Sequence, residues 1–140
     1  MLVVVCSTFG FLVTLAVNLG VAVWMAVRGE GPAVPTVLNQ RLLMLPLWGF
    51  LVPSVWGFNA RWLPVFLGLR PPHARPLYAA VLTAWAAVGA MLCGFGRLAV
   101  VLLLVATLAA IVGLGVFERA QQPPKIKGVH PSFPLFVRGA

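Results

Sequence analysis

Four long runs without a charged side chain dominate this sequence of 140 residues. They cover residues 1–27, 42–60, 77–96 and 98–117, so their lengths are 27, 19, 20 and 20 residues. A helix needs about 20 apolar residues to cross the hydrocarbon core of a bilayer, which is about 30 Å thick. A water-soluble domain of this size could not bury four such runs, which excludes a soluble globular enzyme. The runs predict an all-α fold, a polytopic bundle of about four transmembrane helices within residues 1–117.

Acidic residues are nearly absent from the chain. There is no Asp, and the two Glu residues, Glu30 and Glu118, lie beside apolar runs rather than inside them. Paired carboxylates for general acid and base catalysis are therefore missing, as is an intramembrane carboxylate relay for protons. The formal net charge is +8, but the basic residues flank the runs instead of forming one stripe. The predicted partner is therefore the lipid bilayer and not a nucleic acid.

The basic residues also predict an orientation. If all four runs cross the bilayer, three basic residues lie on the side opposite the N-terminus and seven on the same side. The three are Arg28, Arg41 and Arg97; the seven are Arg61, Arg70, Arg75, Arg119, Lys125, Lys127 and Arg138. Because cytoplasmic loops are enriched in Lys and Arg, both termini are predicted to be cytoplasmic. Residues 118–140 then form a basic cytoplasmic tail, and its apolar part resembles the start of a further helix.

The first run is predicted to be a retained helix and not a cleaved signal peptide. No basic segment follows Met1, and the run exceeds the roughly 7 to 15 apolar residues of a cleavable core. Trp24 and Met25 followed by Arg28 fit the far interface, where an aromatic ring and a snorkelling cation are both satisfied. The apolar start without a basic anchor and the apolar end of the tail favour a segment of a larger protein.

A tight antiparallel hairpin is predicted for the third and fourth runs, because only residues 94–97 remain for the turn. Small residues recur in both runs at steps of three and four, which permits close approach of the two backbones. They are Ala86, Gly89, Ala90 and Cys93 in the third run and Ala106, Ala109, Ala110 and Gly113 in the fourth. The hairpin is interpreted as scaffold.

The second run is the least regular. Interior Pro46 and Pro53 each remove a backbone donor and free a carbonyl one turn earlier, and such carbonyls persist in lipid only when protein or a cavity covers them. Trp48, Gly49 and Trp56 add flat surfaces beside gaps. The pattern predicts a helix that is kinked around another group, for example a planar cofactor.

Arg61 follows this run and has apolar residues on both sides. A guanidinium near the membrane interior is costly unless it is paired or snorkels to the interface, and its planar fork fits a carboxylate or a phosphate. With so few acids in the chain, its counter-ion has to come from a lipid, a ligand or another subunit. Two interpretations stay open: interfacial snorkelling, or binding of a specific anion such as a haem propionate.

The candidate nitrogen ligands are His73 and His130, and neither lies inside a run. His73, in the Pro-rich turn 70–76, is interpreted as a solvated loop residue, whereas His130, at the edge of the apolar tail, is the candidate metal or haem ligand. No pair of His or Cys residues has the spacing of a metal motif.

The other polar side chains inside the runs are assigned structural roles. Ser7, Thr14 and Asn18 share one side of the first helix and are interpreted as a polar seam that binds a neighbouring helix. Cys6 and Cys93 fall at opposite membrane faces, so no internal disulfide is expected.

Two stretches resemble a known family. Residues 49–72 (GFLVPSVWGFNARWLPVFLGLRPP) and 125–138 (KIKGVHPSFPLFVR) are similar to parts of the NnrS-like proteins, which are polytopic and related to subunit I of haem-copper oxidases. Members are larger, with about a dozen spans, and contain haem and copper in the bacterial response to nitric oxide. The resemblance covers about half of the chain. It rests on the pattern residues Gly49, Pro53, Gly57, Arg61, Pro64 and Gly68 and on His130.

This resemblance implies a segment of a haem-binding protein in the bacterial inner membrane. Arg61 would pair with an anionic group of the haem, His130 would serve as an axial or copper ligand, and helices outside this chain would supply the remaining ligands. Two other hypotheses stay open on the residues themselves: a small structural subunit that packs against a larger partner, or half of a dimeric transporter whose kinked second helix lines a pathway.

Overall fold

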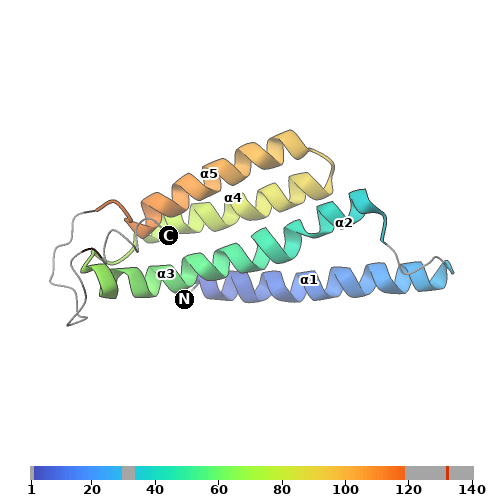
Figure 1. Cartoon of the computed structure of the whole chain (residues 1–140), viewed down its shortest axis with the longest axis horizontal. Helices are drawn as coiled ribbons and strands as arrows, with labels where there is room; N and C mark the ends of the chain where they lie inside the picture. Colours follow the sequence, from blue (N-terminus) through green and yellow to red (C-terminus); the bar gives the residue numbers. More distant parts are fainter. Residues whose placement is uncertain (1, 30–33, 119–131, 133–140) are drawn as a thin grey trace.

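The computed structural model describes residues 2–29, 34–118 and Ser132, and most of this part forms four antiparallel helical spans (Figure 1). The first span is α1 (Leu2–Val27). The second consists of α2 (Thr36–Leu42), the π-helix η1 (Leu45–Leu51) and α3 (Val52–Leu67), the third is α4 (Ala74–Leu92) and the fourth is α5 (Gly96–Leu114). No strand occurs in the described part of the chain. The predicted all-α fold with four spanning helices is confirmed, whereas the predicted tail lies outside the described residues from position 119 on, apart from Ser132.

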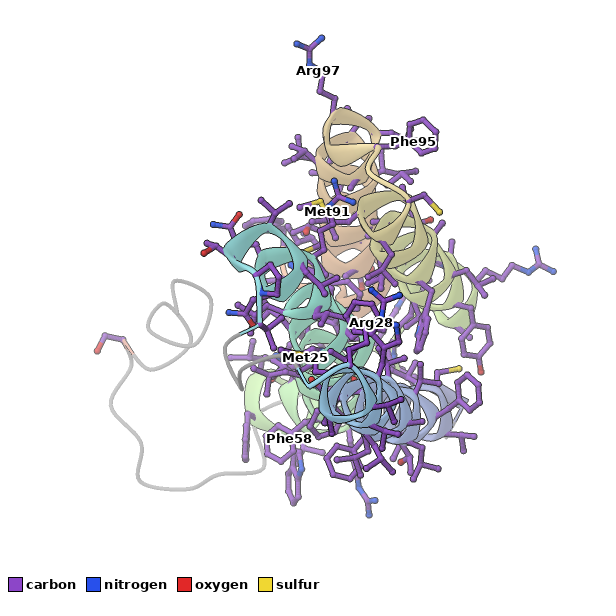
Figure 2. All side chains as sticks on the ribbon, turned by 90° about the vertical axis from the view of Figure 1, so that its right-hand side faces the viewer. Met25, Arg28, Phe58, Met91, Phe95 and Arg97 are labelled. Carbon is purple, nitrogen blue, oxygen red and sulfur yellow. The ribbon has the colours of Figure 1, made fainter. Side chains whose placement is uncertain are left out.

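All four spans are long and apolar enough to cross a membrane, which identifies a membrane-embedded protein. Their outward faces carry large aliphatic side chains, among them Leu19 on α1 and Leu104 and Leu108 on α5, each more than 60% exposed. Phe58 on α3 also points away from the bundle (Figure 2). Such faces fit contact with lipid tails, because burial in the hydrocarbon core removes them from water.

The second span is longer than the predicted run of residues 42–60. It extends from Thr36 to Leu67, which is 32 residues. The predicted run was shorter because it was bounded by two arginines, and an arginine does not end a helix. Arg41 and Arg61 lie twenty residues apart in it, a separation of about 30 Å along a helix axis and hence about the thickness of the hydrocarbon core. The two guanidinium groups therefore bracket the apolar layer, and the helix ends extend beyond it.

The α4–α5 hairpin has the most extensive helix packing among the described residues. Ala80, Ala84 and Ala106 are completely buried between the helices, and a methyl group added at Gly113 would lie only 2.9 Å from the backbone nitrogen of Leu77. At the turn, Gly94 adopts a φ of +90°, a conformation that side chains with a Cβ rarely adopt. The predicted tight hairpin is therefore present, with the expected close backbone approach.

The sequence located the correct packing face on one of these helices only. On α5, Ala106, Ala110 and Gly113 are buried as predicted, with Ala109 half-buried. On α4 the predicted face is wrong: Ala86, Gly89 and Cys93 are exposed and Ala90 is half-buried. The buried face instead combines Ala80, Ala84 and Ala87 with Leu77, Val81 and Val88. Small residues recur on both faces of this Ala-rich helix, and the face that also carries branched side chains buries more apolar surface.

The open end of the hairpin is closed by a backbone hydrogen bond. The amide of His73, just before α4, donates to the carbonyl of Gly113 near the end of α5 at 2.8 Å. At the same place, Nδ1 of His73 lies 3.6 Å from Oε1 of Glu118, and both side chains are partly exposed. The hairpin is thus fixed at both of its ends.

Gly113→Ala should destabilise the bundle. The added methyl group would force α4 and α5 apart, and overpacking of this kind costs about 1–3 kcal/mol. The measurement is the unfolding midpoint of the purified protein in mixed detergent and sodium dodecyl sulfate, followed by circular dichroism. The matched control is Gly89→Ala, because no atom lies within 4 Å of the added carbon at that helical position. Equal midpoints for the two variants would contradict the packing.

Candidate functional site

The kink of the second span is centred on the π-helix η1. Pro46 stands in its first turn, and Pro53 lies at the start of α3 directly after it. In a regular α-helix the amide of residue 53 would bond the carbonyl of Gly49, and proline has no such amide. At such a kink a neighbouring helix can come close to the Gly49 carbonyl, and kinks of this kind occur at prolines and π-turns.

That neighbour is helix α1. Gly10 packs so closely against η1 that a Cβ at this position would overlap the carbonyl group of Gly49. The Cα–H of Gly10 occupies this space and can act as a weak donor to the carbonyl oxygen. The ring of Trp85 from α4 covers both glycines. The inner side of the kink at Gly49 is thus packed against α1 and α4, and the planar cofactor expected at the kink stays a prediction.

The hydroxyl groups of the predicted polar seam on α1 bond their own helix and no other helix among the described residues. Ser7 and Thr14 are buried, but their hydroxyl groups donate to carbonyls of the same helix, Ser7 to Val4 at 2.9 Å and Thr14 to Gly10 at 2.8 Å. The prediction of interhelical hydrogen bonds was wrong for these two residues. In a helix, a Ser or Thr hydroxyl group can bond the backbone carbonyl three or four residues earlier in the same helix. They fill space in the bundle without leaving a polar atom unpaired.

Asn18 is in a different position, because it is exposed although it lies in the central part of α1. Its Nδ2 donates to the carbonyl of Thr14 at 2.8 Å, and no contact is present for its Oδ1 within the described residues. Asn18 is on the wall of a groove of about 450 Å³ between α1 and α2, which diverge at this end of the bundle (Figure 1). Asn39 of α2 and the apolar side chains of Val21, Met25 and Leu42 also line this groove.

Arg61 lies on the exposed side of α3 at the opposite end of the bundle. It borders a hollow of about 580 Å³ that α1, α3 and the start of α4 enclose, with Val4, Gly57, Leu77 and Tyr78 in its walls. Within the described part of the chain, its guanidinium group makes no ion pair and no hydrogen bond. Arg61 is therefore a candidate anion-binding group.

The histidines do not form a metal centre with the other described residues. His73 is at the N-cap position of α4 and faces Glu118, a pairing that the sequence analysis did not predict because 45 residues separate the two. His130 lies outside the described residues, so its predicted role stays a prediction. No group of three His, Cys, Asp or Glu side chains that could hold a metal ion occurs in the part of the chain that is described.

The end of the bundle opposite Arg61 carries three arginines. Arg28 lies over the ring of Trp24, with 4.2 Å between its Cζ and the ring centroid, as expected for an interfacial cation and aromatic pair. The guanidinium of Arg41 lies against Gly94 in the hairpin turn, and Arg97 projects away from the bundle (Figure 2). The basic residues in the described ranges therefore sort to the two ends as predicted.

The cysteines also lie where the topology placed them. Cys6 is near the start of α1 and Cys93 follows the end of α4, at opposite ends of the bundle, and both thiols are free. The sequence analysis missed Tyr78 and Asn39 as lining residues. Their signal was weak, since a single Tyr or Asn near a helix end is common and only the helix arrangement brings it to a groove.

Comparison of the chain with known protein families, with curated proteins and with solved structures gives no match.

Gly10→Ala is expected to disrupt the kink contact. A methyl group cannot occupy the space of the Gly49 carbonyl, so α1 must shift away from η1, at a cost of about 3 kcal/mol. The measurement is again the detergent unfolding midpoint. Gly20→Ala, on the same helix but with no atom within 4 Å of the added carbon, is the matched control. If both variants unfold at the same midpoint, α1 does not pack on Gly49.

Proposed function

We propose that this chain is a helical part of a larger membrane assembly and that a further transmembrane helix packs in the groove between α1 and α2. The observation that carries the proposal is the exposed Asn18 in the middle of a membrane-spanning helix. Lipid tails offer no hydrogen-bond partner to the carboxamide oxygen of Asn18, which is unfavourable. A helix from another subunit, from a second copy or from another part of the same protein would satisfy it.

The shape of the groove supports the same proposal. It combines the polar groups of Asn18 and Asn39 with small side chains, Ala22 and Ala26, on the wall formed by α1. Small residues let a neighbouring backbone come close, and amide side chains bond across helices in membranes. The face of α5 around Leu104 and Leu108 has large aliphatic side chains instead, as expected for a lipid-facing surface.

A photoreactive residue at position 22 should form an adduct with protein when cells are irradiated. The same residue at position 108, on the outer face of α5, should react with lipid alone, since that face is highly exposed and aliphatic. Mass spectrometry of the purified protein identifies both kinds of adduct. Lipid adducts alone at both positions would contradict the proposal.

Asn18→Leu should lower the yield of the protein adduct at position 22. Loss of a polar contact between helices weakens association by about 1 kcal/mol, roughly fivefold. Thr8→Val is the control, because Thr8 is also exposed on α1 and bonds its own helix, at the carbonyl of Val4, but lies outside the groove.

One specific form of this assembly is an NnrS-like haem-binding protein of the bacterial inner membrane that acts in the nitric oxide response. The resemblance of residues 49–72 and 125–138 supports it, as does Arg61 of α3, whose guanidinium group has no ion pair or hydrogen bond among the described residues. In this form Arg61 binds a haem propionate, His130 is an axial haem or copper ligand, helices outside this chain supply the other ligands, and both termini are cytoplasmic.

The second form is a structural subunit whose task is to pack against its partner. The filled kink favours it, because η1 bends around Gly10 and Trp85 and not around an open space. The same observation disfavours the third hypothesis, a transporter whose broken helix lines a pathway, so we do not propose it.

Visible absorbance spectra of the purified protein, oxidised and then reduced with dithionite, separate the two forms. A haem protein should give a Soret band that shifts on reduction, and Arg61→Ala and His130→Ala should each lower the haem content. Arg97→Ala, at the opposite end, should leave it unchanged. A colourless protein that still forms the adduct at position 22 would leave the structural subunit as the proposed function.

A further inference from the structure

Two adjoining hollows, together called the furrow below, lie between Arg61 and the middle of the bundle, at α1 and α4. The hollow beside Arg61 shares two wall residues, Val3 and Tyr78, with a narrower extension of about 60 Å³. The far end of the extension is lined by Cys6, Val81 and Leu82. This furrow exists because α1 and α4 touch only lightly, whereas each packs more closely on the second span.

The furrow has the dimensions of part of an acyl chain. Its wall on α4 extends from Ala74 to Leu82, and eight residues of helix correspond to about 12 Å. Apart from Arg61 and the hydroxyl of Tyr78, its lining side chains have apolar ends. The polar groups lie toward the end of the bundle and the apolar part toward its middle, which is the order of head group and tail in a lipid leaflet.

Charge also favours an anion at this end. Arg61, Arg70 and Arg75 all belong to it, whereas Glu118, beside His73, is the one acid of the described residues there. The guanidinium of Arg61 and the hydroxyl of Tyr78 have no protein hydrogen-bond partner in the described part of the chain. A guanidinium at the boundary of the hydrocarbon core can bind a phosphate oxygen by a charge-assisted hydrogen bond.

We propose that this furrow is a binding site for one anionic phospholipid. Its phosphate is bound by Arg61 and reached by the Tyr78 hydroxyl, and one acyl chain lies between α1 and α4 as far as Cys6 and Leu82. The lipid fills the space that the light contact between α1 and α4 leaves open. This site is separate from the α1–α2 groove, so it does not depend on the partner helix proposed above.

Native mass spectrometry of the purified protein in a non-ionic detergent tests the site. Dioleoyl phosphatidylglycerol is titrated, with dioleoyl phosphatidylcholine and sn-glycerol 3-phosphate as comparison ligands. We expect one molecule of phosphatidylglycerol to bind tightly to each protein molecule. Phosphatidylcholine should bind more weakly, and glycerol phosphate should not bind in the same concentration range. Arg61→Gln should weaken phosphatidylglycerol binding roughly tenfold, whereas Arg97→Gln, an exposed cation at the other end, should leave it unchanged.

A further variant tests the acyl chain separately from the charge. Cys6→Leu keeps Arg61 but fills the narrow part of the furrow, so it should also weaken phosphatidylglycerol binding. Unfolding midpoints close to that of the wild type show that each variant is folded, which is expected because Arg61 is exposed and Cys6 is only partly buried.

Several results would overturn the proposal. Equal effects of Arg61→Gln and Arg97→Gln would show unspecific attraction to a basic protein. Glycerol phosphate binding as tightly as the lipid would indicate a site for a soluble phosphate compound. If Cys6→Leu binds phosphatidylglycerol as tightly as the wild type does, the acyl chain does not lie in the furrow. A Soret band in the wild type that Arg61→Gln abolishes would assign Arg61 to haem instead.

Discussion

The contact between Gly10 and the Gly49 carbonyl sets the arrangement of the first two spans. Pro53 has no amide to offer this carbonyl in the α-helical register, and the second span bends at this point. Covering this carbonyl requires a helix with no side chain at the contact, and α1 provides Gly10 there. The divergence of α2 from α1 and the groove between them follow from this fixed point, because a helix that bends at η1 cannot stay close to α1 along its whole length.

The bilayer imposes the second constraint, because it limits the depth in the membrane at which charged groups can lie. Arg41 and Arg61 are separated along one helix by about the thickness of the hydrocarbon core, so both reach the lipid head groups without being drawn into the tails. The middle of the molecule is therefore closely packed, while the α1–α2 groove and the furrow beside Arg61 open towards its two ends. Both candidate sites lie where two helices separate, and neither lies in the centre of a fully packed core.

Much of the fold was readable from the sequence, because the rule that lipid-exposed backbone must form helices leaves few alternatives for four apolar runs. The hairpin at Gly94 followed from the shortness of its turn, and Arg61 was selected as a candidate from its apolar surroundings, a role that stays a prediction. The packing face of α4 was not predicted correctly, since small residues recur on both faces of this helix and their spacing alone does not show which face is buried. The occupant of the kink was also missed, because a single Gly10 in an apolar helix carries no sign of the carbonyl that will meet it.

The hydrogen bond from the His73 amide to the Gly113 carbonyl has a consequence for biogenesis. Together with the Gly94 turn it closes α4 and α5 into a loop with short connections, whose main contacts are local in sequence. Local contacts form quickly, since little chain entropy is lost in bringing them together. The two helices can therefore enter the bilayer as one preassembled unit, and the α1 and α3 layer can dock on it afterwards.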